Sequence, residues 1–201
     1  MATLTTKNKY KKISQLGEKG KEAKTYLVVD KFNCEYAMKT FRRNKSSEKM
    51  AKEVELQRRC SKAGISPRII DYDTEDKFIV MEKMDGHLID LMKTTQGILS
   101  ENLQKQIISL FKKMDKIKVF QGDANILNYM IKGNNVFIID FGYSKEVDEK
   151  LIKKLGTKTP NIELMLLGFI LKLKDLKCPA SSFSLLTKYL SEEKRKSYGI
   201  L

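Results

Sequence analysis

Three polar residues surround a short apolar hairpin in the middle of the chain. Asp123 and Asn128 come before the predicted outgoing strand, residues 129–132, and Asp140 follows the predicted returning strand, residues 136–139. The Gly-Asn-Asn between the strands favours a turn, so Asp140 should lie close to Asn128. A carboxylate beside an amide oxygen suits magnesium, and Asp123 is left free to meet a hydroxyl. These are the parts that phosphoryl transfer from a nucleotide requires.

This segment resembles the catalytic segment of the protein-kinase superfamily, in which H-R-D-x-x-x-x-N is followed by D-F-G. The corresponding stretches are Gln121-Gly122-Asp123, with Asn128 after a further four residues, and Asp140-Phe141-Gly142. The resemblance implies that ATP is the phosphate donor, that Asp123 is catalytic, and that Asn128 and Asp140 hold Mg²⁺. A hairpin with incidental acidic residues is the alternative, and the combined spacing favours the kinase-like interpretation.

A loop near the N-terminus lies where a kinase glycine-rich loop belongs, between the first two predicted strands. Its candidate nucleotide-binding residues are Gly17, Gly20 and Ala23. Glycines let backbone amides approach phosphates closely. The spacing is not G-x-G-x-x-G, so a plain β-turn is the alternative. Residues 20–23, Gly-Lys-Glu-Ala, are more similar to the G-x-E-A loop of the small kinase of the KEOPS tRNA-modification complex.

The next strand and helix resemble the kinase lysine–glutamate pair. Ala37-Met38-Lys39 is similar to the V-A-I-K strand, and the alternation of a strand places Ala37 and Lys39 on one face. The small Ala37 leaves room for adenine, and Lys39 can reach the phosphates. Glu53 matches the helix glutamate that pairs with this lysine, with Glu55 as the alternative.

The stretch 78–84 resembles the strand that leads into the kinase hinge. By this resemblance Met81 is the gatekeeper beside adenine, and the backbones of Glu82 and Met84 bind the adenine edge. An ordinary core strand is the alternative, and it predicts the same residues up to Val80.

The pattern as a whole predicts an α+β, two-lobed protein-kinase-like fold, with residues 1–201 forming a single domain. The small antiparallel N-lobe, at about 10–82, should contain one helix, 48–62, and strands at 12–16, 26–30, 34–41, 68–72 and 77–84. A hinge at about 82–86 leads to a truncated, mainly helical C-lobe at about 87–201. Its helices are expected at 88–94, from Ser100 onward, at 161–174 and at 183–195.

The chain also departs from the kinase pattern. Gln121 and Gly122 replace the His and Arg of H-R-D, which removes the cation that would receive a phosphorylated activation loop. Asn125 stands where Ser/Thr kinases carry a lysine. Only 17 residues separate Gly142 from Pro160 and they contain no A-P-E, so there is little room for a peptide-docking platform.

Composition sets broad limits on the class of protein. The 201 residues are 41% hydrophobic and 32% charged, which is ordinary for a globular protein. The polar, basic first residues and three widely spaced cysteines favour an intracellular location, cytoplasmic or nuclear, or a host cell if the protein is viral. No membrane span is expected. The net charge of +14 suits an acidic partner or a nucleic-acid-associated complex, but the scattered lysines favour simple solvation.

Three functions remain open. The first is a compact serine/threonine protein kinase that phosphorylates a protein hydroxyl. The second is a kinase-like ATPase or small-molecule phosphotransferase serving a tRNA-modification assembly. The third is a nucleotide-binding pseudokinase. The matches at Lys39, Asp123, Asn128 and Asp140 disfavour the third. The missing peptide-platform motifs favour the second, but no large insertion or acidic pocket for a cationic small molecule is evident, which favours the first. The function expected first is therefore a compact serine/threonine protein kinase.

Overall fold

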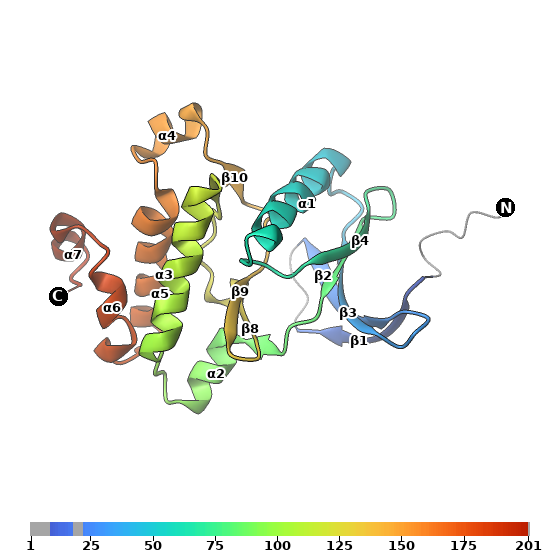
Figure 1. Cartoon of the computed structure of the whole chain (residues 1–201), viewed down its shortest axis with the longest axis horizontal. Coiled ribbons are helices and arrows are strands. Elements are labelled where there is room, and N and C mark those ends of the chain that lie inside the picture. Colours follow the sequence, from blue (N-terminus) through green and yellow to red (C-terminus); the bar gives the residue numbers. More distant parts are fainter. Residues whose placement is uncertain (1–8, 18–21, 201) are drawn as a thin grey trace.

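The computed structural model describes residues 9–17 and 22–200, and it has two parts (Figure 1). An antiparallel sheet with one helix forms the N-terminal part, and a mainly helical part follows it in the chain. This arrangement confirms the predicted α+β, two-lobed kinase-like fold. In the described part of the chain, no helix is both long and apolar enough to cross a membrane.

The N-terminal sheet has five strands in the order β1-β2-β3-β5-β4. Their bounds are β1 Lys11–Leu16, β2 Ala23–Val29, β3 Glu35–Phe41, β4 Ile69–Asp73 and β5 Phe78–Glu82. Strand β3 lies at the centre and pairs with β5, so that Ala37 is opposite Met81 and Lys39 is opposite Ile79. The expected adenine and phosphate contacts therefore lie on adjacent central strands.

Helix α1, Ser47–Lys62, packs against this sheet through an apolar face. Ser46 caps it, accepting a 3.2 Å hydrogen bond from the backbone N–H of Lys49. Met50 and Val54 are buried with Ile79 and Met81 of the sheet. Glu53 lies between Met50 and Val54 in the sequence and is buried with them, which fixes its carboxylate close to the sheet.

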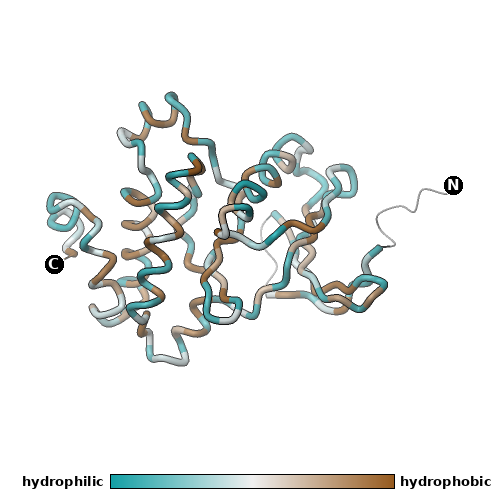
Figure 2. The backbone as a smooth tube through the Cα atoms, viewed as in Figure 1, coloured by the Kyte–Doolittle hydropathy of each residue, from teal (hydrophilic) through white to brown (hydrophobic). Residues whose placement is uncertain are grey.

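The second part is built on two long helices, α3 (Glu101–Lys116) and α5 (Leu166–Asp175), whose apolar residues share one core. Along α3 the tube of Figure 2 alternates between brown and teal, as expected for a helix with one buried and one solvent-facing side. The shorter elements around this core are β6 Gly86–His87, α2 Leu88–Thr94, β7 Val119–Phe120, η2 Ile126–Asn128, β8 Tyr129–Lys132, β9 Asn135–Ile138, β10 Lys145–Glu146, α4 Glu149–Leu155, η3 Asn161–Met165, η4 Ala180–Ser182, α6 Ser184–Thr187 and α7 Glu192–Ser197.

Several predicted boundaries change in the structure. The amphipathic helix predicted at 183–195 is wrong, because α6 ends at Thr187 and α7 begins at Glu192. Ser191 caps α7 by accepting a hydrogen bond from the N–H of Lys194, so a new helix starts there. The helix predicted at 161–174 starts with one wide turn, η3, before α5. Ala23 belongs to β2, pairing with Phe41, and not to the preceding loop.

Candidate active site

The hairpin of β8 and β9 sets the distance between the two candidate magnesium ligands. Tyr129 pairs with Ile138, and the N–H of Ile139 donates to the carbonyl of Asn128 at 2.9 Å. Asn128 and Asp140 therefore stand at the base of one hairpin, one at the start of the outgoing strand and one after the returning strand. This is the arrangement that the turn residues predict.

Lys39 forms two ion pairs, one within the N-terminal part and one across the cleft. Its Nζ lies 2.6 Å from Oε1 of Glu53 and 2.9 Å from Oδ1 of Asp140. The Lys39 and Glu53 side chains are 16% and 2% exposed, so water screens this pair weakly. Glu55, the alternative partner, is exposed and pairs with Lys52 instead.

These contacts shift the pKa values of both partners across the cleft. Burial lowers the pKa of Lys39, but the charges of Glu53 and Asp140 outweigh it, and the net pKa is raised. Burial raises the pKa of Asp140, but the charge of Lys39 outweighs it, and the net pKa is lowered. The lysine is therefore cationic and Asp140 anionic at neutral pH, as binding of phosphate and metal requires.

Asp123 is oriented by its own loop. Its Oδ2 accepts a 3.0 Å hydrogen bond from Nδ2 of Asn128, and its Oδ1 accepts one of 3.0 Å from the N–H of Asn125. The donation by Asn128 orients its amide so that the carbonyl oxygen faces away from Asp123. One residue of the predicted metal pair thus positions the predicted catalytic carboxylate.

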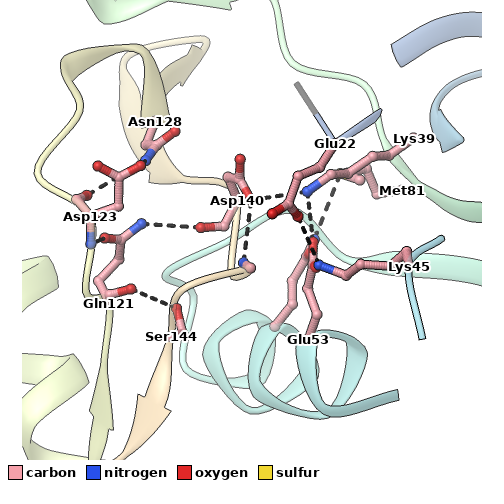
Figure 3. A network of polar contacts seen from close by, with 12 residues as sticks. Glu22, Lys39, Lys45, Glu53, Met81, Gln121, Asp123, Asn128, Asp140 and Ser144 are labelled. Carbon is pink, nitrogen blue, oxygen red and sulfur yellow. Dashed lines mark hydrogen bonds and ion pairs between the residues drawn. The ribbon is translucent and has the colours of Figure 1, made fainter. Parts of the chain in front are cut away.

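Gln121 joins Asp123 to Asp140. Its Nε2 donates to the backbone carbonyl of Asp140 at 3.1 Å, and its Oε1 accepts from the N–H of Asp123 at 2.6 Å. The side chain is fully buried. In Figure 3 the dashed contacts run without a break from Asn128 through Asp123, Gln121, Asp140 and Lys39 to Glu53. In the sequence Gln121 is visible only as a departure from H-R-D, and no motif indicates this bridging position.

A second buried amide, Asn161, holds the backbone of the catalytic segment. Its Oδ1 accepts from the N–H of Gln121 at 3.1 Å, and its Nδ2 donates to the carbonyl of Val119 at 2.8 Å. Asp115 in turn accepts from Nδ2 of Asn161 at 2.7 Å. Asn161 was missed as well, although a polar residue at the head of a strongly apolar helix was a signal that could have found it.

Gly122 has no room for a side chain. Its φ is +80°, and a Cβ placed on it would lie 2.5 Å from the carbonyl oxygen of Tyr143. The segment after Asp140 therefore packs directly on the backbone of the catalytic loop. Asp140 itself has a φ of +62°, an unusual value for a residue with a side chain, while Phe141 is buried in the core.

The donor atoms fit magnesium. Within residues 9–17 and 22–200, Oδ2 of Asp140 and the side-chain oxygen of Asn128 accept no hydrogen bond. The same residues contain no group of three or more His, Cys, Asp or Glu side chains that could hold a metal alone. Magnesium commonly takes one or two protein oxygens and completes its shell with phosphates and water. A two-oxygen site therefore suits Mg²⁺ that arrives with a nucleotide.

A pocket beside this network holds most of the residues predicted to bind nucleotide. Its wall includes Gly17, Ala37, Lys39, Met81, Glu82, Met84 and Asp140. Ala23 is not part of this wall, and Gly20 lies outside the described residues. The N–H of Glu82 donates to the carbonyl of Arg68 at 2.9 Å, so this N–H is not free to bind an adenine edge.

Lys45 adds a second cation that sequence analysis missed. Its Nζ lies 3.1 Å from Oε2 of Glu53 and 3.0 Å from Oε2 of Glu22. Its side chain is 10% exposed, and Lys39 and Lys45 therefore share the two oxygens of Glu53 (Figure 3). No sequence motif marks this lysine, because the contact depends on how the turn before α1 folds back.

Fold and site together define a kinase-like protein. Residues 28–159, which are more than half of the chain, match the ABC1 atypical kinase-like domain. The chain belongs to that family.

Curated relatives share a smaller part of the sequence. A probable bifunctional tRNA threonylcarbamoyladenosine biosynthesis protein of Methanobrevibacter smithii is 29% identical over 84 residues, 42% of this chain and 14% of the relative. The protein of the same description from Methanococcus vannielii is 34% identical over 97 residues, 46% of this chain and 17% of the relative. An uncharacterized protein from the hydrogenase 1 5′ region of Clostridium pasteurianum is 35% identical over 89 residues, 43% of this chain and 17% of the relative. The matched part of the chain thus spans less than a fifth of each relative.

Proposed function

We propose that the chain binds ATP with Mg²⁺ and transfers or hydrolyses its terminal phosphate in the service of a tRNA-modification assembly. The observation that carries the proposal is the contact of Lys39 with both Glu53 and Asp140, at 2.6 and 2.9 Å, beside the Asp123–Asn128 pair. Lys39 from one lobe and Asp140 from the other line a single pocket, and the Asp123–Asn128 pair lies beside it, which is the charge pattern that a nucleoside triphosphate needs.

Each residue has a defined part in this proposal. Lys39, held by Glu53, binds the phosphates, and Asn128 and Asp140 hold Mg²⁺, which would neutralise the charge that develops on the phosphates. Asp123 orients the acceptor and takes its proton. Because the carboxylates and the lysine are already positioned, catalysis rests on orientation and charge stabilisation.

The acceptor is proposed from two observations. The names of two relatives describe tRNA threonylcarbamoyladenosine biosynthesis, which favours a role beside tRNA and an intracellular location. The segment from Gly142 to Pro160 contains only β10 and α4, so no extended surface for a peptide follows the metal residue. Water is then a sufficient acceptor, and the reaction is ATP hydrolysis.

A serine/threonine protein kinase is the second candidate, and one observation favours it. Leu127 and Tyr143, on the two segments that carry Asp123 and Asp140, are 48% and 63% exposed. Exposed apolar side chains on both catalytic segments would give an incoming polypeptide a place to bind near Asp123.

The test is incubation with labelled ATP and Mg²⁺, alone, with generic acidic and basic proteins, and with tRNA. Asp140→Ala should lower magnesium-dependent phosphate release or transfer at least about 100-fold while the fold survives, because it removes a metal ligand. Asp175→Ala, an exposed aspartate that pairs with Lys172, is the matched control and should leave the rate unchanged.

Phosphate release that rises with tRNA supports the ATPase proposal, whereas label on serine or threonine supports the protein kinase. Tight ATP binding without turnover supports a pseudokinase. Equal rates for Asp140→Ala and the parent would overturn the assignment of the metal site.

A further inference from the structure

A groove on the helical part of the molecule lies outside the nucleotide pocket. Helix α3 and the segment around α6 form the wall of this groove. The residues of the wall are Lys105, Ile108, Ser109, Lys112, Lys113, Lys116, Leu185 and Tyr189. None of these residues lines the nucleotide pocket. We call this feature the α3 groove, and the catalytic proposal leaves it without a role.

Four lysines lie along the α3 groove. They are Lys105, Lys112, Lys113 and Lys116. Three of these lysines and one serine, Ser109, recur at spacings of four, three and four residues and form one stripe of the helix, Lys105-Ser109-Lys112-Lys116. At a rise of about 1.5 Å per residue, the stripe from Lys105 to Lys116 is about 16 Å long. Several cations spread along such a stripe match a chain of negative charges better than a single anion.

Most of this positive charge is uncompensated. Lys105 pairs with Glu101 at 2.6 Å. Within the part of the chain that the structure describes, Lys112, Lys113 and Lys116 have no carboxylate at ion-pair distance. All three are exposed. Exposed lysines of α4 (Lys150, Lys153 and Lys154) have no ion pair in the described part of the chain either, so what distinguishes the α3 groove is a row of unpaired cations beside an aromatic ring.

An aromatic ring stands among these lysines. Tyr189 is 39% exposed, and the Nζ of Lys112 lies 4.5 Å from the centroid of its ring. Tyr189 is far from α3 along the chain, so the sequence does not show this aromatic residue among the lysines. Packing of α6 against α3 brings the ring and the lysines together.

We propose that the α3 groove binds single-stranded nucleic acid. The lysines would neutralise successive phosphates, and the ring of Tyr189 would stack with a base, which is the combination that sequence-tolerant single-strand binding uses. An acidic peptide would satisfy the lysines but would leave the exposed ring without a matching partner. Binding here does not depend on ATP, so it can be tested apart from the catalytic proposal.

The test measures binding of a labelled single-stranded oligoribonucleotide of about 12 nucleotides to the full chain by fluorescence anisotropy at several salt concentrations. Combined Lys112→Gln, Lys113→Gln and Lys116→Gln should weaken binding on the order of tenfold or more at about 100 mM salt. The slope of log affinity against log salt should fall by about 2, because each phosphate contact on a single strand contributes about 0.7.

A matched triple variant on another helix controls for net charge. Lys150→Gln, Lys153→Gln and Lys154→Gln remove the same charge from exposed positions of α4 and should change affinity by less than about twofold. Equal losses in the two triple variants would show diffuse attraction and overturn the proposal.

Tyr189 separates stacking from charge. Tyr189→Ala should weaken binding about fivefold or more, whereas Tyr189→Phe keeps the ring and should bind like the parent. Full affinity in Tyr189→Ala, or displacement of the RNA by an equal charge of polyglutamate, would replace the nucleic-acid proposal with an acidic protein partner. Absence of RNA binding by the parent at about 100 mM salt would overturn it. ATP binding by all variants should match the parent, which also shows that they are folded.

Discussion

The side-chain amide of Gln121 donates a 3.1 Å hydrogen bond to the backbone carbonyl of Asp140, from a position where protein kinases carry histidine. The same amide accepts from the N–H of Asp123, so one uncharged side chain positions the backbones of both aspartates of the site. Glutamine does not titrate, and the bridge therefore persists at any pH at which the fold is intact.

Gln121→Leu should slow phosphate release about 10- to 100-fold, because the backbones of Asp123 and Asp140 lose the contact that positions them. It should also lower the free energy of unfolding by about 1–3 kcal/mol, since a buried donor and a buried acceptor lose partners. Steady-state kinetics and urea unfolding measure the two effects.

Gln104→Leu is the matched control for Gln121→Leu. Gln104 is also buried and makes three hydrogen bonds, to Leu99, Ser181 and Leu185, away from the nucleotide pocket. Gln104→Leu should lower the free energy of unfolding by about as much as Gln121→Leu does, and it should leave kcat unchanged. Equal losses of kcat in the two variants would show that the effect of Gln121 is only structural.

The Lys39–Asp140 pair predicts how stability depends on pH. Asp140 has a lowered pKa, so its contribution is present above the ordinary carboxyl pKa and is lost as the pH falls below about 4. Lys39 has a raised pKa, so its contribution is present below the ordinary lysine pKa and is lost as the pH rises above about 10.

The difference in unfolding free energy between the parent and Asp140→Asn should therefore be constant from about pH 5 to 9 and shrink below about pH 4. For Lys39→Gln the difference should shrink below about pH 4, where Asp140 takes up its proton, and also above about pH 10, where Lys39 loses its own. Chemical denaturation across this range measures both differences. A change centred near pH 6 or 7 would contradict the ion pair.

Gly122→Ala should lower the free energy of unfolding by more than the ordinary penalty of about 1–3 kcal/mol for a side chain at positive φ. The added Cβ would also meet the carbonyl oxygen of Tyr143 at 2.5 Å and push the segment that carries Asp140. The rate of phosphate release should fall as well, because Asp140 is displaced.

Gly156→Ala isolates the steric part of the Gly122 effect. Gly156 has a similar φ of +73°, and no atom lies within 4 Å of its added Cβ. In urea unfolding, Gly156→Ala should lose only the free energy that the positive φ costs a side chain, and it should keep full activity. Equal destabilisation by the two substitutions would mean that the Tyr143 contact relaxes without cost.

Asn161→Asp should place two carboxylates against each other, because Asn161 donates to Asp115 at 2.7 Å. Burial already raises the pKa of Asp115, and the new charge should raise it further. Stability should fall by about 2–3 kcal/mol at neutral pH and recover partly at acid pH, where a shared proton relieves the repulsion.

The double variant Asn161→Asp with Asp115→Asn reverses the donor and the acceptor. Thermal unfolding at neutral pH should show that it recovers part of the lost stability, because the amide now donates from position 115. If the double variant is no more stable than Asn161→Asp alone, the pair does not determine how the catalytic segment is held.

The sequence by itself determined the class of fold and predicted most residues of the candidate site. Turn chemistry between β8 and β9 predicted that Asn128 and Asp140 would meet, and strand alternation predicted that Ala37 and Lys39 would share a face. Such local patterns are readable because hairpin register and strand periodicity depend on neighbouring residues. Local periodicity gave the wrong result at 183–195. Apolar residues keep a helical spacing there, but the helix ends after Thr187 and a new one, capped by Ser191, begins at Glu192.

Only the tertiary structure decided which distant groups complete the site. Gln121, Lys45 and Asn161 contact residues that are not their neighbours in the chain (Asp140, Glu53 and Asp115), and their spacing in the sequence does not indicate these partners. The choice of Glu53 over Glu55 also required the packing of α1 on the sheet, which buries one carboxylate and leaves the other in water. Contacts between segments far apart in the chain depend on how whole elements pack, and packing is a property of the folded molecule.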